Sequence, residues 1–187
     1  MGKPRMFKIT FRPTRAETPL WWLLLKIVLQ TVVFWTLFLL VLPAGLIWLE
    51  GVLGWPAFRF DGQRVLGVIL FVLGGSLGLT SGATMGIYGR GTPVPFDTAR
   101  QLVVAGPYRF VRNPMAIAGL VQGAAVGLYF GSGLVLAYVV VGMVLWNICV
   151  RPVEEQDLET RFGEAFVAYR REVRCWVPRW KGYRVVR

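Results

Sequence analysis

The chain has 187 residues, of which 55% are hydrophobic and eight are tryptophan, and its formal net charge is +11. Basic residues lie at the ends and between long apolar segments, a distribution typical of membrane proteins and not of nucleic-acid-binding proteins. Histidine is absent, which excludes His-dependent triads and the common zinc sites, and Cys149 and Cys175 indicate neither a metal site nor a disulfide framework. We therefore predict a single membrane domain over residues 1–187, without a metal.

Two apolar segments in the first half of the chain predict two transmembrane helices. The first covers 27–49, and it begins at Leu20 if the amine of Lys26 reaches the membrane surface. Pro43 is expected to kink this helix, because proline has no N–H group to donate. The second helix covers about 65–88, where six glycines favour close contact with a neighbouring helix.

A longer uncharged segment, residues 114–150, predicts a helical hairpin. As one helix it would be roughly 55 Å long, whereas the hydrocarbon core of a bilayer is ~30 Å thick. The sequence YFGSG at 129–133 supplies the turn. We therefore expect a third transmembrane helix over 114–130 and a fourth over 133–150.

The predicted hairpin places two charged clusters at one membrane face. Arg109 and Arg112 precede the hairpin, and Glu154 and Glu155 follow it. Because the chain folds back, both pairs return to the same boundary between water and lipid. Charged groups at such a boundary are often functional, so these four side chains are the first candidates for a site.

The segment after the hairpin, residues 152–173, predicts an amphipathic helix. Its apolar residues recur at spacings of three to five, which favours a helix along the membrane or over the bundle; they are Val153, Leu158, Phe162, Phe166, Tyr169 and Val173. The expected fold is an all-α integral membrane protein with about four transmembrane helices, including a C-terminal helical hairpin, followed by an amphipathic helix.

The charges of the connecting segments predict the orientation of the chain. The N-terminal segment is rich in basic residues, which favours the cytoplasmic side; these are Lys3, Arg5, Lys8, Arg12 and Arg15. The connection between the first two spans is neutral and is expected outside, and the next connection is basic again. An even number of spans then places both termini in the cytoplasm, and we expect an integral protein of a bacterial inner membrane.

Three sequence motifs carry a family resemblance. They are GRGTPVPF at 89–96, LVVAGPYRFVRNPM at 102–115, and EEQDLETRFGEAFVAYRREVRCWVP at 154–178. In their order and their spacing around an uncharged hairpin, they resemble the isoprenylcysteine carboxyl methyltransferase and phospholipid methyltransferase family of small membrane enzymes. One departure is Asn113, which stands where the family commonly has histidine, and the aromatic residue that usually follows is missing at Ala116 or Ile117.

The resemblance covers roughly the C-terminal half of the chain and implies a cofactor-binding core and a cofactor. Residues 1–19 would be a basic N-terminal segment, 20–88 two spans, 89–178 the cofactor-binding core and 179–187 a basic tail. The implied cofactor is S-adenosylmethionine, whose sulfonium and ammonium groups need anions, whose carboxylate needs a cation, and whose adenine needs an apolar wall. The implied activity is methyl transfer to a lipophilic acceptor at the cytoplasmic face, either an isoprenylcysteine-like carboxylate or a phospholipid amine.

The candidate site residues follow from these motifs. The candidate catalytic residues are Glu154, Glu155 and Arg151. The candidate cofactor-binding residues are Leu102, Val103, Gly106, Pro107, Tyr108, Arg109, Arg112, Asn113, Pro114, Met115, Glu154 and Glu155. Within this set we expect Glu155 and Arg112 to hold opposite ends of one bound cofactor. The expected partners are a lipid or other lipophilic substrate and membrane lipids, without nucleic acid, and the oligomeric state stays open.

Each candidate also has a structural interpretation. Glu154 and Glu155 in a first helical turn would complement the helix dipole. Asn113 before Pro114 would cap the third span. Arg109 and Arg112 would bind lipid phosphates, as would the basic tail with its tryptophans.

Two other functions compete with methyl transfer. A membrane-bound, NADPH-dependent reductase of the sterol type has a similar C-terminal half, and the arginines of this chain would hold the phosphate of its cofactor. A four-span scaffold without enzymatic activity would bind neither cofactor.

Overall fold

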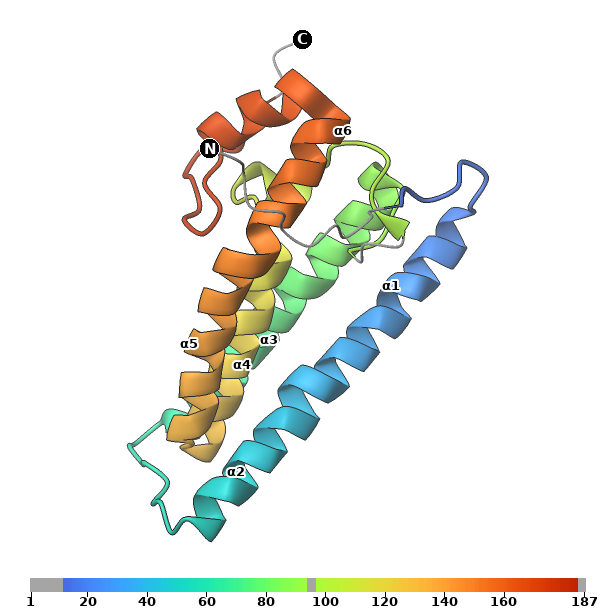
Figure 1. Ribbon diagram of the computed structural model, residues 1–187. Coiled ribbons are helices and arrows are strands. Elements are labelled where there is room, and N and C mark those ends of the chain that lie inside the picture. Colours follow the sequence, from blue (N-terminus) through green and yellow to red (C-terminus); the bar gives the residue numbers. More distant parts are fainter. Residues whose placement is uncertain (1–11, 94–96, 185–187) are drawn as a thin grey trace, which may run out of the picture.

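The computed structural model describes residues 12–93 and 97–184, and all the regular structure in these ranges is helical. The basic residues Lys3, Arg5 and Lys8, and the last three residues of the predicted tail, lie outside the described residues. The elements are α1 (Leu20–Trp35), the π-helical η1 (Thr36–Val41), α2 (Leu42–Val52), α3 (Gln63–Thr84), the π-helical η2 (Met85–Gly89), the 3₁₀-helical η4 (Gly106–Arg109), α4 (Pro114–Phe130), α5 (Gly133–Leu145), the π-helical η5 (Trp146–Val150) and α6 (Arg151–Glu172). The all-α prediction is confirmed (Figure 1).

The helices form the predicted transmembrane bundle. Three continuous helices are long and apolar enough to cross a membrane: Leu20–Val52, Gln63–Gly89 and Gly133–Glu172. The apolar helix α4 is shorter, with 17 residues, and it forms the first arm of the hairpin. The first arm begins and ends where the uncharged segment predicts, and the second begins at the predicted Gly133, because a charge-free sequence leaves only the YFGSG turn as a place to reverse.

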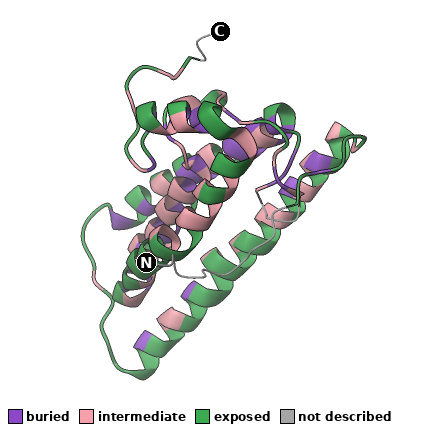
Figure 2. Ribbon diagram, turned by 45° about the horizontal axis from the view of Figure 1, so that its top comes forward, coloured by how far each residue is buried: buried purple, intermediate pink, exposed green. Residues whose placement is uncertain are grey.

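The first span begins at Leu20, and Lys26 donates a hydrogen bond to Asp97 at 2.6 Å. The kink expected at Pro43 is absent, since the helix is nearly straight there in Figure 1. The π-helical turn η1 ends at Val41, two positions before this proline. At its other end the span is held by Glu50, whose Oε1 accepts a hydrogen bond of 2.7 Å from the backbone N–H of Leu134. Between these ends most of its large apolar side chains are exposed, as lipid contact requires (Figure 2).

Residues 152–173 were predicted to form a separate helix, but α6 continues from the fourth span. Val150 and Arg151 both have right-handed helical backbone angles, and the N–H of Arg151 donates to the carbonyl of Trp146. The axis bends further on, at Gly163, whose φ of 52° lies in the left-handed region. In Figure 1, α6 therefore carries the fourth span out of the bundle and then turns across it.

The closest helix contact joins α3 and α4. A Cβ atom added at Gly74 would lie 2.8 Å from Cγ of Gln122 and 3.1 Å from the carbonyl oxygen of Ala118. One more contact of this kind occurs at Gly67, where a Cβ atom would lie 3.0 Å from the carbonyl oxygen of Ala125. Small residues thus allow the two backbones to approach, which is the main source of packing between helices in lipid.

Gly74→Val is expected to lower the free energy of unfolding by about 1 to 3 kcal/mol, because the added methyl groups overfill this contact. The matched control is Gly45→Val, since a Cβ atom at Gly45 meets nothing within 4 Å. Thermal unfolding of both variants in the same detergent measures the difference. Equal melting temperatures would contradict the close packing of α3 and α4.

Candidate functional site

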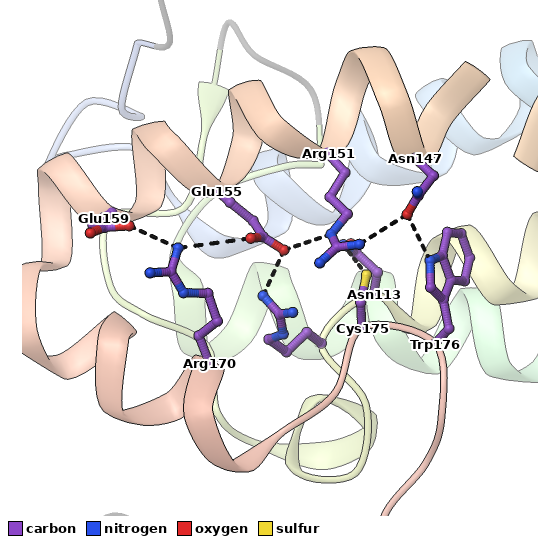
Figure 3. Close-up of polar contacts among 9 residues, drawn as sticks. Asn113, Asn147, Arg151, Glu155, Glu159, Arg170, Cys175 and Trp176 are labelled. Atoms are coloured by element: carbon purple, nitrogen blue, oxygen red, sulfur yellow. Dashed lines mark hydrogen bonds and ion pairs between the residues drawn. The ribbon is translucent and has the colours of Figure 1, made fainter. Parts of the chain in front are cut away.

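The loop before the hairpin and the helix after it meet in an ion pair. Nη1 of Arg112 lies 2.7 Å from Oε1 of Glu155, and both side chains are largely buried, with 9% and 17% of their surface exposed (Figure 3). The hairpin produces this contact, because α4 and α5 are antiparallel neighbours and return the chain to its starting face. Of the two predicted charged clusters, Arg112 and Glu155 therefore meet.

Glu155 is surrounded by three guanidinium groups, those of Arg112, Arg151 and Arg170, and these four side chains are called the Glu155 cluster. Besides Arg112, Nε of Arg151 lies 2.8 Å from Oε1, and Nη1 of Arg170 lies 3.8 Å from Oε2. Arg170 also pairs with Glu159 at 2.8 Å. Burial by itself would raise the pKa of Glu155, but the hydrogen bond from Arg151 and the charges of Arg112 and Arg151 outweigh it and lower this pKa. The carboxylate is thus held in its charged form.

Glu155 and Arg112, which we expected to hold opposite ends of one bound cofactor, contact each other directly. Their role toward a cofactor stays a prediction. Sequence reasoning also missed Arg170, which lies fifteen residues after Glu155 and reaches it because the helix bends between them. Gly163 was the only signal for that bend.

Glu154 differs sharply from its neighbour. Its carboxylate makes no hydrogen bond or ion pair with any described residue. Glu154 lies beyond the apolar segment that ends at Val150. Burial, followed by the charges of Glu155 and Asp157, raises the pKa of Glu154 to about 7. A carboxyl group with this pKa is both acid and base near neutral pH.

The helix-dipole interpretation of the two glutamates loses its basis. It requires a free helix N-terminus near Glu154, whereas the backbone continues without a break from η5 into α6. The N–H groups there are satisfied by carbonyls of the preceding turn. The carboxylate of Glu155 pairs instead with Arg112, from the loop before the hairpin.

Tyr108 and Arg112 each present a buried polar atom without a partner among the described residues. These atoms are the hydroxyl of Tyr108 and Nε of Arg112. The carbonyl of Tyr108 accepts a 2.6 Å hydrogen bond from the hydroxyl of Tyr169, which attaches the loop to α6. Burial and then the charges of Tyr169 and Glu154 raise the pKa of Tyr108, so its hydroxyl stays protonated and able to donate. Two donors thus lie beside Glu154 and Glu155 unsatisfied, as expected of a site that binds a polar ligand.

Leu102 and Val103 point to different neighbours. Leu102 packs against the buried cluster of Phe166, Tyr169 and Val173 on α6. Val103 lies close to Gly89, where a Cβ atom would be 2.6 Å from its Cγ2. Only Leu102 is therefore in place to line a site beside α6.

Four of the other candidate residues lie apart from the Glu155 cluster. Nε of Arg109 donates to the carbonyl of Tyr183 in the C-terminal tail, and Met115 lies against α3, where a Cβ atom at Gly82 would be 3.8 Å from its Cε. Gly106 and Pro107 shape the loop: Gly106 has a φ of 51° and lies tightly against Thr84, and Pro107 stands in the first turn of η4. Gly106, Pro107 and Arg109 therefore position the loop, whereas Met115 lies between α4 and α3.

Asn113 and Arg151 have partners around the cluster. Nδ2 of Asn113 lies 3.7 Å from Sγ of Cys175 and makes no capping bond to α4, which Pro114 begins. Nη1 of Arg151 donates to Oδ1 of Asn147 at 3.0 Å, and the same oxygen accepts from Nε1 of Trp176 (Figure 3). The capping interpretation of Asn113 is therefore wrong for its side chain.

Two apolar grooves lie elsewhere in the bundle. One of about 220 Å³ opens between α3 and α4, and another of about 310 Å³ between the first span and α4. Val126 and Phe130 line both grooves, near the hairpin turn. Both grooves thus lie at the far membrane face from the Glu155 cluster.

Comparisons with known proteins identify the family of this chain. The sequence profile described as phospholipid methyltransferase matches residues 63–165, which is more than half of the chain and includes the loop at 106–113, the hairpin and the two glutamates. No curated protein and no solved structure gave a match. The chain therefore belongs to the phospholipid methyltransferase family of membrane methyltransferases.

Proposed function

We propose that the protein transfers a methyl group from S-adenosylmethionine to a lipophilic acceptor, at the membrane face that carries the Glu155 cluster. The observation that carries this proposal is the contact between Arg112 and Glu155, inside the matched region and beside the unpartnered carboxylate of Glu154. The positive-inside rule favours the cytoplasmic side for this face, which would place both termini there. A bacterial inner membrane is the proposed location.

The chemical groups beside the cluster fit S-adenosylmethionine. The carboxylate of Glu154 would balance a cationic group, and the free Nε–H of Arg112 would bind the carboxylate of the cofactor. The hydroxyl of Tyr108 is a second free donor, and Leu102 offers an apolar surface for the adenine. Glu155 would act indirectly, since it holds Arg112 and Arg151 in place.

Glu154 is the proposed general base, and this role favours an amine acceptor. The bound cofactor supplies an electrophilic methyl group. Glu154 would accept the proton of the acceptor's ammonium, which would leave the nitrogen with a lone pair able to take the methyl group from the sulfur of the cofactor. The proton stays on Glu154 until solvent removes it. An isoprenylcysteine-like carboxylate needs no base, and its charge would be repelled by Glu154, so it is the second candidate.

Titration with S-adenosylmethionine tests the proposal. In detergent, the cofactor should stabilise the protein by about 2.7 kcal/mol at a concentration one hundred times its dissociation constant, because it binds only the folded state. Thermal unfolding measures this shift, and NADPH in the same assay should leave the melting temperature unchanged. Stabilisation by NADPH alone would favour the sterol-type reductase. No shift with either cofactor would favour the scaffold.

A further inference from the structure

The C-terminal tail, residues 173–184, is fastened along the loop of the candidate site. The N–H of Arg112 donates to the carbonyl of Arg174 at 3.0 Å, and the N–H of Arg179 donates to the carbonyl of Phe110 at 3.0 Å. A third bond of 2.8 Å runs from the N–H of Tyr183 to the carbonyl of Arg109. The path of the tail is therefore set by the fold.

Trp176 places this tail at the edge of the membrane. Its Nε1 donates to Asn147, and its ring packs edge-on against Trp146 with 5.1 Å between the centroids. Asn147 lies one turn before Arg151, the first charged residue after the fourth span, which is roughly 6 Å along the helix. Tryptophan is enriched at this level of a bilayer.

Trp180 continues the tail as a fully exposed side chain. Its indole makes no hydrogen bond with any described residue, and Val177, three positions earlier, is also exposed. Trp180 lies four positions after Trp176, so the two lie within about 14 Å of each other. An indole at this level can insert between lipid headgroups, where its apolar ring and its N–H are both satisfied.

Unpaired positive charges lie near Trp180 in the sequence. Arg179 pairs with Glu172 at 3.0 Å. The other basic residues of the region are exposed and form no ion pair with any described residue; they are Arg171, Arg174, Lys181 and Arg184. Such a cluster beside a membrane attracts anionic lipid.

We propose that residues 174–184 form a docking surface for anionic phospholipids of the same membrane face, with Trp180 inserted among the headgroups and Arg174, Lys181 and Arg184 on the phosphates. This surface is separate from methyl transfer and does not depend on it. Since the main chain of the tail is bonded to the loop at 109–112, a docked lipid also restrains the loop that presents Arg112.

Quenching by brominated lipid tests the docking surface in the full-length protein. Vesicles of phosphatidylcholine would carry bromine on one third of the lipids, either on phosphatidylcholine or on phosphatidylglycerol. The difference in emission between the wild type and Trp180→Phe isolates Trp180 from the other tryptophans. We expect brominated phosphatidylglycerol to quench Trp180 at least twice as strongly as brominated phosphatidylcholine does. High salt should reduce this difference, because it screens the attraction between the basic side chains and the anionic lipid.

Neutralising variants complete the test. Arg174→Gln/Lys181→Gln/Arg184→Gln should reduce quenching by phosphatidylglycerol to the level found with phosphatidylcholine. The matched control is Arg59→Gln/Arg64→Gln, which removes charge at the opposite membrane face and should keep the difference. Equal quenching by both lipids in the wild type, or none by either, would overturn the proposal.

Discussion

Glu155→Gln should weaken S-adenosylmethionine binding about tenfold to a hundredfold, which corresponds to ~1.5 to 3 kcal/mol for a lost charge-assisted contact. The physical reason is that Glu155 holds Arg112 and Arg151 in position through bonds of 2.7 and 2.8 Å. Without its charge, largely buried guanidinium groups face one another. Removing one partner of a buried ion pair costs ~3 to 5 kcal/mol of stability, and the partial exposure of this pair favours the lower end. Isothermal titration and thermal unfolding measure the two effects.

A double variant separates stability from binding. Arg112→Gln/Glu155→Gln removes both charges, so it should recover part of the stability lost in Glu155→Gln, yet it should not recover cofactor binding. The control is Glu159→Gln, because Glu159 is exposed and its pair with Arg170 should contribute no more than about 1 kcal/mol. Wild-type affinity in both Glu155→Gln and the double variant would remove Glu155 and Arg112 from the cofactor site.

Glu154→Gln should reduce the rate of methyl transfer to an amine by about 10² to 10⁴, the usual contribution of a general base. In the wild type, only the ionised carboxylate accepts a proton, so the rate should rise with pH through the pKa of about 7 and then level off. Glutamine has no such group, and the rise should disappear. The control is Glu164→Gln, since Glu164 is exposed and does not contribute to the raised pKa of Glu154, so this variant should keep the pH profile. An unchanged rate in Glu154→Gln with an amine substrate would exclude this base.

The same substitution should have the opposite effect on stability. Folding raises the pKa of Glu154, so the folded protein binds the proton more tightly than the unfolded chain does. The free energy of unfolding therefore falls as pH rises from the ordinary carboxyl pKa to about 7. Glu154→Gln should melt above the wild type at pH 8 and close to it at pH 4, which a pH series of melting curves measures.

Sequence predicted the hairpin well because its signal is strong. No charged residue interrupts 114–150, and YFGSG offers the reversal, so the ends of both arms follow from hydropathy and bilayer thickness. The junction at Arg151 was harder to predict. Proline is common in first helical turns, so Pro152 predicted the start of a new helix. Instead, the π-helical turn η5 joins α5 to α6 without a break before Pro152. Local sequence does not distinguish these outcomes, since they differ only in how the preceding carbonyls are paired.

The details of the site depended on tertiary contacts that no spacing reveals. Arg109 and Arg112 are three residues apart in one motif, yet Arg109 bonds to the tail and Arg112 to Glu155. The adjacent glutamates likewise differ, since only Glu155 faces the arginines. Which member of each pair takes part is decided by backbone direction in the loop and in α6, and this becomes fixed only when the tail and the hairpin pack together.

The two hydrogen bonds that hold the ends of the first span, one from Lys26 and one to Glu50, can form only after later parts of the chain have been synthesised. Asp97, the partner of Lys26, is 71 residues later in the chain, and Leu134, whose N–H donates to Glu50, is 84 residues later. At ~5 to 20 residues per second, these partners leave the ribosome roughly 4 to 17 s after the residues they bind. During that interval the newly inserted helix carries a lysine and a glutamate without their final partners. The hydrogen bond from Leu134 to Glu50 forms only when the hairpin has entered the bilayer. The first span is therefore among the last helices to gain its polar contacts.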